Sequence, residues 1–215
     1  NIIGYDVDMA REMAKQMGVK LTLVPTAWDG IIAGLITDKF DIIMSGMTIT
    51  QQRNLEVNFS DPYIVVGQTV LLRNSLASTI KSAKDLDKPE YTIVTKLGVT
   101  GEIATRKFFK KAKIVTFETE SDATSEVLNG KADAMVYDQP YNVVFMSDKG
   151  KDKLVHLDTS LTYEPLGFAI RKGDPDFLNW LNNFIRQSKE DKVVGFSDEL
   201  YNKWLVDTSW LQRVQ

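Results

Sequence analysis

Two stretches of the sequence combine small residues with side chains that could bind an anion. The first is residues 45–53 (SGMTITQQR), in which Gly46 and Met47 precede the hydroxyl of Thr48 and the guanidinium of Arg53. A guanidinium grips a carboxylate through two parallel charged hydrogen bonds, and Thr48 adds a further donor. These residues predict a carboxylate clamp. The alternative is that Thr50 caps a helical turn and leaves Arg53 on its solvated side.

The second stretch is residues 97–102 (LGVTGE), between a predicted strand and a predicted helix. Free backbone N–H groups around Val99 and Thr100, together with the positive end of the helix dipole, suit a carboxylate. The stretch lacks the lysine and the spacing of a P-loop, so nucleotide phosphate fits poorly. A capping turn with a purely structural role is the alternative.

Two further residues could complete a site. Asp138, at a predicted strand end, could accept hydrogen bonds from an ammonium, and Trp28, at a predicted helix start, could form a flat, cation-attracting wall. Taken singly, each residue is more often structural, because aspartate caps helices and tryptophan fills cores. Taken together, the candidates offer two groups for a carboxylate, one for an ammonium and one for a side chain, which is the pattern of a zwitterion.

Composition excludes several other kinds of site. The 215 residues are 43% hydrophobic and 26% charged, which is ordinary for a globular chain of one large or two small domains. Twenty-six basic and 29 acidic residues are interspersed, so nucleic acid is not an expected partner. With no cysteine and His156 as the one histidine, thiolate and multi-imidazole metal sites are excluded, and we expect no metal or other cofactor. The apolar runs are too short for a transmembrane segment.

Hydrophobic periodicity predicts helices and strands in alternation. In the first part of the chain it predicts a helix over 6–17, a strand over 19–23, a helix over 28–36 and a strand over 40–44. The middle part predicts strands over 91–95, 113–117 and 134–137 and helices over 100–111, 121–128 and 139–146. The last third predicts a strand over 166–171 and helices over 174–187 and 197–205. This alternation indicates an α/β fold with two mostly parallel sheets flanked by helices.

One pattern occurs twice. Residues 38–46 and 130–138 each follow a predicted helix and contain a lysine, a spacer, an aspartate and an apolar strand. Gly46 and Asp138 stand at the same place in the two copies, five residues after the aspartate. We therefore expect each sheet to present one of them at the carboxyl end of a strand, where α/β sheets bind ligands. The alternative is a helix-to-strand turn shared by chance.

These residues resemble a known family. Residues 4–8 (GYDVD), 28–32 (WDGII), 39–43 (KFDII), 46–53 and 59–63 (FSDPY) are similar to the polar amino-acid family of solute-binding proteins of ABC importers. Residues 98–102, 132–138 and 165–170 continue the similarity in the family's order, so it covers essentially the whole chain.

The resemblance implies a two-lobed periplasmic-binding-protein type II fold with a two-strand hinge. Lobe 1 is expected at residues 1–72 and 166–215 and lobe 2 at 73–165, with crossovers near residues 70–72 and 164–166. The resemblance also implies an extracytoplasmic, monomeric protein that closes around an amino acid and presents it to a membrane permease.

It further assigns ligand contacts to residues of this chain. Arg53, Thr48 and the helix start at Thr100 would meet the α-carboxylate. Asp138, the Gly46 carbonyl and the Thr48 hydroxyl would meet the α-ammonium, and Trp28 would pack on the ligand's side chain. Met47 and Val99 complete the predicted ligand-binding set, which contains no catalytic residue.

Within the family, residues 28–30, 164–167 and 171–175 look most like those of members that bind lysine or arginine, and of the related cyclohexadienyl dehydratases. A dehydratase is the alternative function, although the sequence shows the carboxylate clamp without a motif-placed acid. A third candidate function is the sensor module of a receptor kinase, which would need flanking membrane segments that this sequence does not show. Family members usually open with a strand and an aromatic-Pro-Phe loop before the counterpart of residues 4–6. We expect that this segment is missing here and that it carries the acid that selects a cationic side chain.

Overall fold

The computed structural model describes residues 2–157, 159–191, 193 and 195–213. Its contacts divide the chain into two units: unit 1 comprises Asn1–Val65 and Pro165–Gln215, and unit 2 comprises Val66–Glu164. The two connections between the units are β3 (Ile64–Val66) and β9 (Glu164–Leu166), which pair with each other.

The predicted lobe boundary after residue 72 differs from this division. It lies within β4 (Gln68–Arg73), whose backbone pairs with β7 and β8 of unit 2. The first crossover is therefore β3 and not residues 70–72, because Val70, Leu71 and Leu72 are fully buried in the core of unit 2. The predicted second boundary, after residue 165, is one residue from the observed one.

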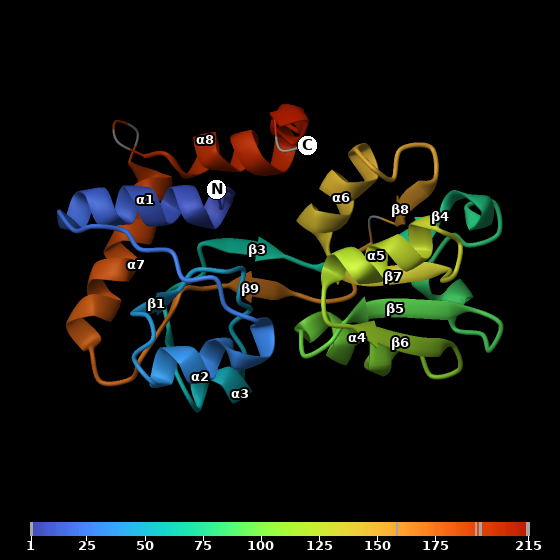
Figure 1. Cartoon of the computed structure of the whole chain (residues 1–215), viewed down its shortest axis with the longest axis horizontal. Helices are drawn as coiled ribbons and strands as arrows, with labels where there is room; N and C mark the ends of the chain where they lie inside the picture. Colours follow the sequence, from blue (N-terminus) through green and yellow to red (C-terminus); the bar gives the residue numbers. More distant parts are fainter. Residues whose placement is uncertain (1, 158, 192, 194, 214–215) are drawn as a thin grey trace. The chain divides into compact units, whose positions relative to one another are not determined.

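Unit 2 is built on one five-stranded sheet in the order β6-β5-β7-β4-β8 (Figure 1). Its other strands are β5 (Thr92–Lys96), β6 (Lys113–Phe117), β7 (Ala134–Asp138) and β8 (Leu154–Leu157). Strand β5 runs parallel to β6 and β7, whereas β4 is antiparallel to β7 and β8. The helices of the unit are η2 (Asn74–Leu76), η3 (Ala83–Leu86), α4 (Thr100–Phe108), α5 (Glu120–Leu128) and α6 (Gln139–Ser147).

Alternation along these strands buries both faces of the sheet. Val70 and Ile93 belong to one buried cluster, whereas the next residues, Leu71 and Val94, belong to another. Successive side chains of a strand point to opposite faces, so each face has its own core. Because both faces of the sheet are buried, a strand such as β4 has an uninterrupted apolar run instead of alternating apolar and polar residues.

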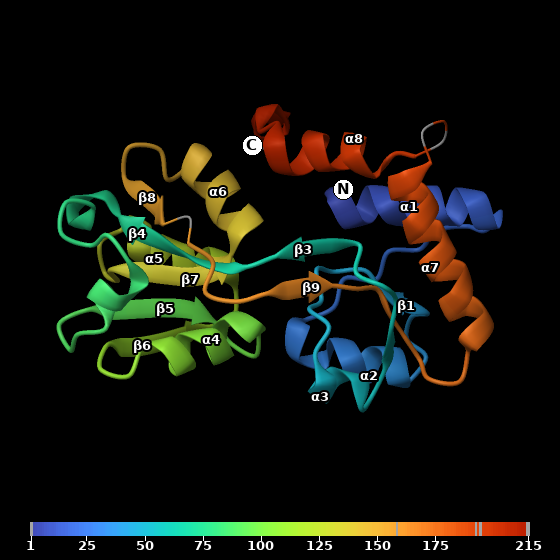
Figure 2. The ribbon, with the colours of Figure 1, turned by 180° about the vertical axis from the view of Figure 1, so that it is seen from behind.

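Unit 1 has a smaller sheet in the order β1-β10-β2, formed by β1 (Ile42–Ile43), β10 (Ala169–Ile170) and β2 (Asn58–Phe59). Its helices are α1 (Tyr5–Met17), η1 (Trp28–Gly30), α2 (Ile31–Ile36), α3 (Gln51–Asn54), α7 (Pro175–Glu190), α8 (Ser197–Tyr201), η4 (Asn202–Val206) and η5 (Ser209–Arg213). Figure 2 shows α1 and α8 side by side, with α7 crossing near them. Both strand pairs of the sheet are antiparallel. The expected parallel pairing is thus not found in this three-stranded sheet, because β10 runs opposite to both neighbours.

Most predicted elements are confirmed within a few residues, including β6, which matches the predicted range. The predicted strand over 166–171 is divided between β9 and β10, which pair with different partners. A Cβ atom on Gly167, at the break, would lie 2.8 Å from Ile49 and 3.2 Å from the Ser60 carbonyl. The predicted strand over 19–23 is wrong, because this segment pairs with no strand in the described part of the chain.

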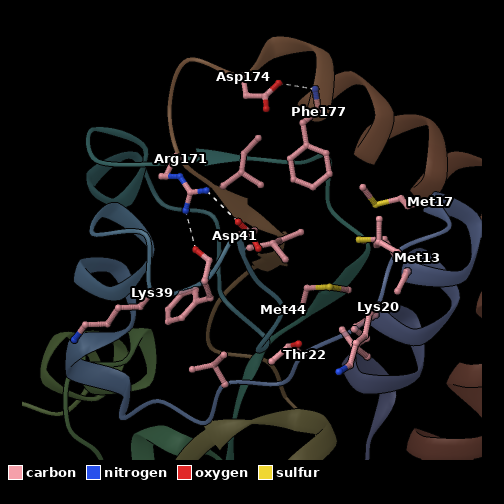
Figure 3. Close-up of a pocket in the computed structure, with 18 residues that line it drawn as sticks. Met13, Met17, Lys20, Thr22, Lys39, Asp41, Met44, Arg171, Asp174 and Phe177 are labelled. Atoms are coloured by element: carbon pink, nitrogen blue, oxygen red, sulfur yellow. Dashed lines mark hydrogen bonds and ion pairs between the residues drawn. The ribbon is translucent and has the colours of Figure 1, made fainter.

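A groove lies beside that segment in unit 1. It has a volume of about 690 Å³, is lined by residues of α1, residues 19–24 and β1, and a second hollow of about 470 Å³ shares several of its walls. Figure 3 shows Met13, Met17 and Met44 beside the groove, with Phe177 and the Arg171–Asp41 ion pair also at its walls. The groove is mainly apolar.

Candidate functional site

In unit 1 the structure brings three of the predicted residues together. The first turn of α3 is capped by Thr50, whose hydroxyl accepts a hydrogen bond from the Arg53 N–H. The Arg53 guanidinium donates to the Thr48 carbonyl at 2.8 Å, and its Cζ lies 5.4 Å from the centroid of the Trp28 ring. The capping interpretation is thus confirmed for Thr50. It does not leave Arg53 on a solvated side, because the side chain is half-buried against Thr48 and Trp28.

The turn before Arg53 is fixed by its backbone. Gly46 adopts φ +61°, the left-handed region that favours glycine. Met47 is 1% exposed, and its side chain packs in the core of unit 1, so any contribution from this residue to a ligand would be through its backbone. Thr48 forms an isolated bridge with Leu166, and the Met47 carbonyl accepts from the N–H of Gly167. The turn is therefore held on the β9–β10 segment.

In unit 2 a residue that the sequence analysis missed joins two of the predicted ones. Gln68, at the start of β4, is 1% exposed. Its amide nitrogen donates to Asp138 Oδ1 at 2.6 Å and to the Thr100 hydroxyl at 3.4 Å. Its Oε1 is buried and has no hydrogen-bond partner among the described residues. Gln68 thus fixes the Asp138 carboxylate relative to the start of α4.

The start of α4 is a strand-to-helix turn, as the sequence predicts. Val99 is the N-cap residue and makes no side-chain capping bond, while the preceding N–H of Gly98 donates to Glu102 at 2.8 Å. A Cβ atom on Gly101 would lie 2.8 Å from Oε1 of Gln68, so a larger residue here would displace that side chain. The close packing of Gln68 on this helix explains how Thr100 and Asp138 come together.

A buried polar network lies beside Asp138 in the chain and joins α6 to β4, β7 and β8. Asn142, which is fully buried in α6, donates to the Thr69 carbonyl and hydroxyl and to the Tyr137 carbonyl. His156, in β8, shares a hydrogen bond of 2.8 Å with the Thr69 hydroxyl. Burial and the charge of Asp138 raise the pKa of Tyr137 far above its ordinary value, so its phenol stays protonated.

The largest hollow described above is separate from these residues. None of the predicted ligand-binding residues lines the groove beside residues 19–24, which reaches only Met44 of the neighbouring turn. Among the described residues, no three or more carboxylate, imidazole or thiol side chains gather where they could hold a metal ion. No described helix combines the length and apolar character needed to cross a bilayer.

The two-unit α/β fold, with one set of polar groups on each unit, defines a two-lobed periplasmic-binding-protein architecture. The family of bacterial extracellular solute-binding proteins, family 3, matches residues 1–207, and the chain belongs to this family.

Solved structures support the same assignment. The chain is 65% identical to a binding component of an ABC transporter from Wolinella succinogenes DSM 1740, whose crystal structure is complexed with lysine. The match covers 99% of this chain and 90% of that one, with a TM-score of 0.95. It is also 50% identical to an ancestral amino-acid-binding protein, a precursor of cyclohexadienyl dehydratase, over 94% of this chain and 85% of that one, with a TM-score of 0.85.

One curated relative is an enzyme. The chain is 35% identical to the cyclohexadienyl dehydratase of Pseudomonas aeruginosa over 135 residues, which cover 63% of this chain and 50% of that protein. The relatives therefore include both binding proteins and a dehydratase on one family scaffold.

Proposed function

We propose that this protein is the extracytoplasmic amino-acid-binding component of an ABC importer and that its ligand is lysine or arginine. The observation that carries the proposal is the Arg53 guanidinium held against Trp28 and the Thr48 carbonyl. A guanidinium fixed in this way is preorganised for a carboxylate. Similarity to the lysine complex supports a cationic ligand.

In this proposal, residues of both units bind the carboxylate, and residues of both units bind the ammonium. Arg53 and Thr48 of unit 1, with the N–H groups at the start of α4 in unit 2, bind the α-carboxylate. Asp138, together with the Gly46 carbonyl and the Thr48 hydroxyl, binds the α-ammonium. Trp28 contacts the aliphatic stem and the cationic end of the side chain. A ligand that draws on both units favours the closed form, with β3 and β9 as the hinge, and the monomer presents it to a permease.

A binding panel tests this proposal. Thermal shifts with each of the twenty amino acids should be largest for lysine or arginine, and calorimetry should give affinities at least tenfold above those for glutamine and glutamate. Trp28→Ala should narrow this gap, because the ring's contribution is about 0.5–2 kcal/mol. Asp138→Ala should abolish binding of every amino acid. A largest shift with an acidic or small neutral ligand would exclude the cationic assignment.

The dehydratase is the alternative that the Pseudomonas relative supports. We expect no turnover, because expelling a hydroxyl needs an acid placed at the leaving group, and the one carboxyl of the proposed ligand-binding set, Asp138, is assigned to the α-ammonium. Incubation with prephenate and arogenate, followed by chromatography, decides the question. Phenylpyruvate or phenylalanine formed above the uncatalysed rate, and lost in Arg53→Ala, would establish the enzyme instead.

A further inference from the structure

A carboxylate that the proposed site does not use lies directly against the Gly46 turn. Asp6 is the second residue of α1, and its Oδ2 accepts hydrogen bonds from the N–H of Gly46 at 2.8 Å and from the Tyr63 hydroxyl at 3.1 Å. These three residues are far apart in sequence and belong to the same unit. Burial raises the pKa of Asp6, and the two hydrogen bonds oppose that effect.

The second donor is itself rigidly placed. Tyr63 is 3% exposed and stacks on Phe168, with ring centroids 4.4 Å apart, and on Tyr5, at 6.0 Å. Burial, followed by the charge of Asp6, raises the pKa of Tyr63 well above its ordinary value, so the hydroxyl remains a donor. Two fixed donors and the positive end of α1 therefore hold the Asp6 carboxylate in one position.

The Asp6 contact fixes the backbone at Gly46. Gly46 has no side chain, and a Cβ atom placed on it would meet nothing within 4 Å, so neighbouring side chains do not fix its backbone. Its N–H is held by Asp6 on one side. On the other side, Met47 is buried and its carbonyl accepts from Gly167. The Gly46 carbonyl between these two anchors has one orientation.

We propose that Asp6 is a positioning residue for amino-acid recognition: it fixes the Gly46 carbonyl for the ligand's α-ammonium and places a negative charge behind it. This inference rests on the proposed function, because it assigns Asp6 to the ammonium half of that site. A polar group held in place before binding costs less ordering free energy when the ligand arrives. The carboxylate also makes the surrounding potential more favourable for a cation.

The test compares Asp6→Asn with Asp8→Asn, a matched control two residues further along the same helical turn. Asp8 also holds distant groups, because it accepts hydrogen bonds from Lys203 and from the Trp204 indole, and among the described residues its side-chain hydrogen bonds go to these two and to Arg11 rather than to the Gly46 turn. Calorimetry measures two ligands for each variant: lysine, and 6-aminohexanoate, which keeps the carboxylate and the distal ammonium and lacks the α-ammonium. Circular dichroism verifies that each variant is folded.

We expect Asp6→Asn to weaken lysine binding at least tenfold and 6-aminohexanoate binding less than threefold, so that the preference for lysine narrows. Asp8→Asn should change both affinities by less than twofold. Tyr63→Phe removes one donor from Asp6 and keeps the ring stack, so it should weaken lysine binding about threefold; this variant decides the question if Asp6→Asn does not fold.

Three outcomes overturn the inference. Equal weakening of both ligands in Asp6→Asn would show a general structural role, and unchanged lysine binding would show no role. Failure of the unmodified protein to bind any amino acid would refute the proposed function and this inference with it, and that result is visible before any variant is made.

Discussion

Residues 38–43 of unit 1 and 130–135 of unit 2 form the same turn in different surroundings. Both turns begin with a left-handed residue, Asp38 at φ 60° and Gly130 at φ 74°. In both, an arginine from the adjacent antiparallel strand or its end reaches the aspartate before the apolar strand: Arg171 to Asp41, and Arg73 to Asp133. The repeated sequence pattern therefore encodes a repeated ion pair.

The two ion pairs differ in burial. The side chain of Asp133 is 13% exposed, whereas that of Asp41 is 91% exposed. In unit 2 the second oxygen of Asp133 accepts from the N–H of Thr92 at 2.7 Å, at the start of β5. In unit 1 no described strand occupies the place beside β1 that β5 occupies beside β7, and the groove of about 690 Å³ lies there. The neighbouring strand β5 thus gives the Asp133 carboxylate a second hydrogen bond and a buried position that Asp41 lacks.

The predicted ligand contacts of the two units also differ, in how each key side chain is held. In unit 1, Arg53 is anchored locally, by the Thr48 carbonyl and the Trp28 ring. In unit 2, Asp138 is anchored by Gln68, from a strand distant in sequence. In unit 1 we therefore expect ligand binding to be weakened mainly by substitution of the contact residue itself. In unit 2 we expect it to be weakened also by substitution of Gln68, which holds the contact residue Asp138.

The largest effect is expected from Arg53→Ala. Loss of one partner of a desolvated charge pair costs about 2–5 kcal/mol, so calorimetry should show at least a thirtyfold weaker affinity for the amino acid. Arg106→Ala is the control, because this arginine pairs with Glu102 on an exposed face of α4. An Arg53→Ala affinity within twofold of the unmodified protein would mean that this side chain makes no contact with the ligand.

The next effect contrasts the two repeated turns directly. Asp133→Asn should lower the free energy of unfolding by about 2–3 kcal/mol, because the half-buried Arg73 loses its counter-charge. Asp41→Asn should cost less than about 0.5 kcal/mol, as for other exposed pairs. Urea unfolding of both variants measures the difference. Equal losses of unfolding free energy in the two variants would show that burial of the aspartate does not determine the strength of its ion pair.

The elements that sequence reasoning predicted well are those that local periodicity determines. The spacing of Met9, Met13 and their neighbours gives α1, and the alternation over 113–117 gives β6. The alternation over 19–23 is equally regular and forms no strand, because a strand also needs a partner, and pairing is not encoded locally. The same limit explains the misplaced boundary after residue 72, since an apolar run does not show which sheet it joins.

The candidate site divides in the same way. Arg53, Thr48 and Trp28 could be named from their types and spacing, and the structure brings them together within unit 1. Gln68 and Asp6 could not be named, because each matters only through a contact made far along the chain. A glutamine in an apolar strand, bounded by glycine and threonine, was the one available indication of the former.

A smaller effect is expected from Gln68→Leu. Without the amide, Asp138 loses the hydrogen bond that Gln68 donates to its Oδ1, and binding of the amino acid should weaken about tenfold, or roughly 1.4 kcal/mol. Stability should change little, because the substitution also removes the buried, unpaired Oε1. Thr69→Val, in the adjacent position of β4, is the control: it should reduce stability through the His156 contact and leave binding unchanged. If the two variants bind alike, the support of Asp138 does not come from Gln68.

The smallest expected effect is on the pH dependence of stability and comes from Asp8, which joins α1 to the C-terminal helices of unit 1. Burial raises the pKa of Asp8, but hydrogen bonds from Lys203, Trp204 and Arg11 outweigh it, so the pKa lies below its ordinary value.

A carboxyl whose pKa is lower in the folded state binds fewer protons there than in the unfolded chain. Its stabilisation is complete above the unfolded pKa, about 3.9, and is lost as the pH falls through the folded value. Between pH 6 and pH 3 the unmodified protein should therefore lose about 1 kcal/mol more unfolding free energy than Asp8→Asn, which has no such group to protonate. Thermal unfolding across this range measures both curves. Parallel curves would mean that the Lys203 and Trp204 contacts add nothing to stability, and that the C-terminal helices are held on α1 by apolar packing alone.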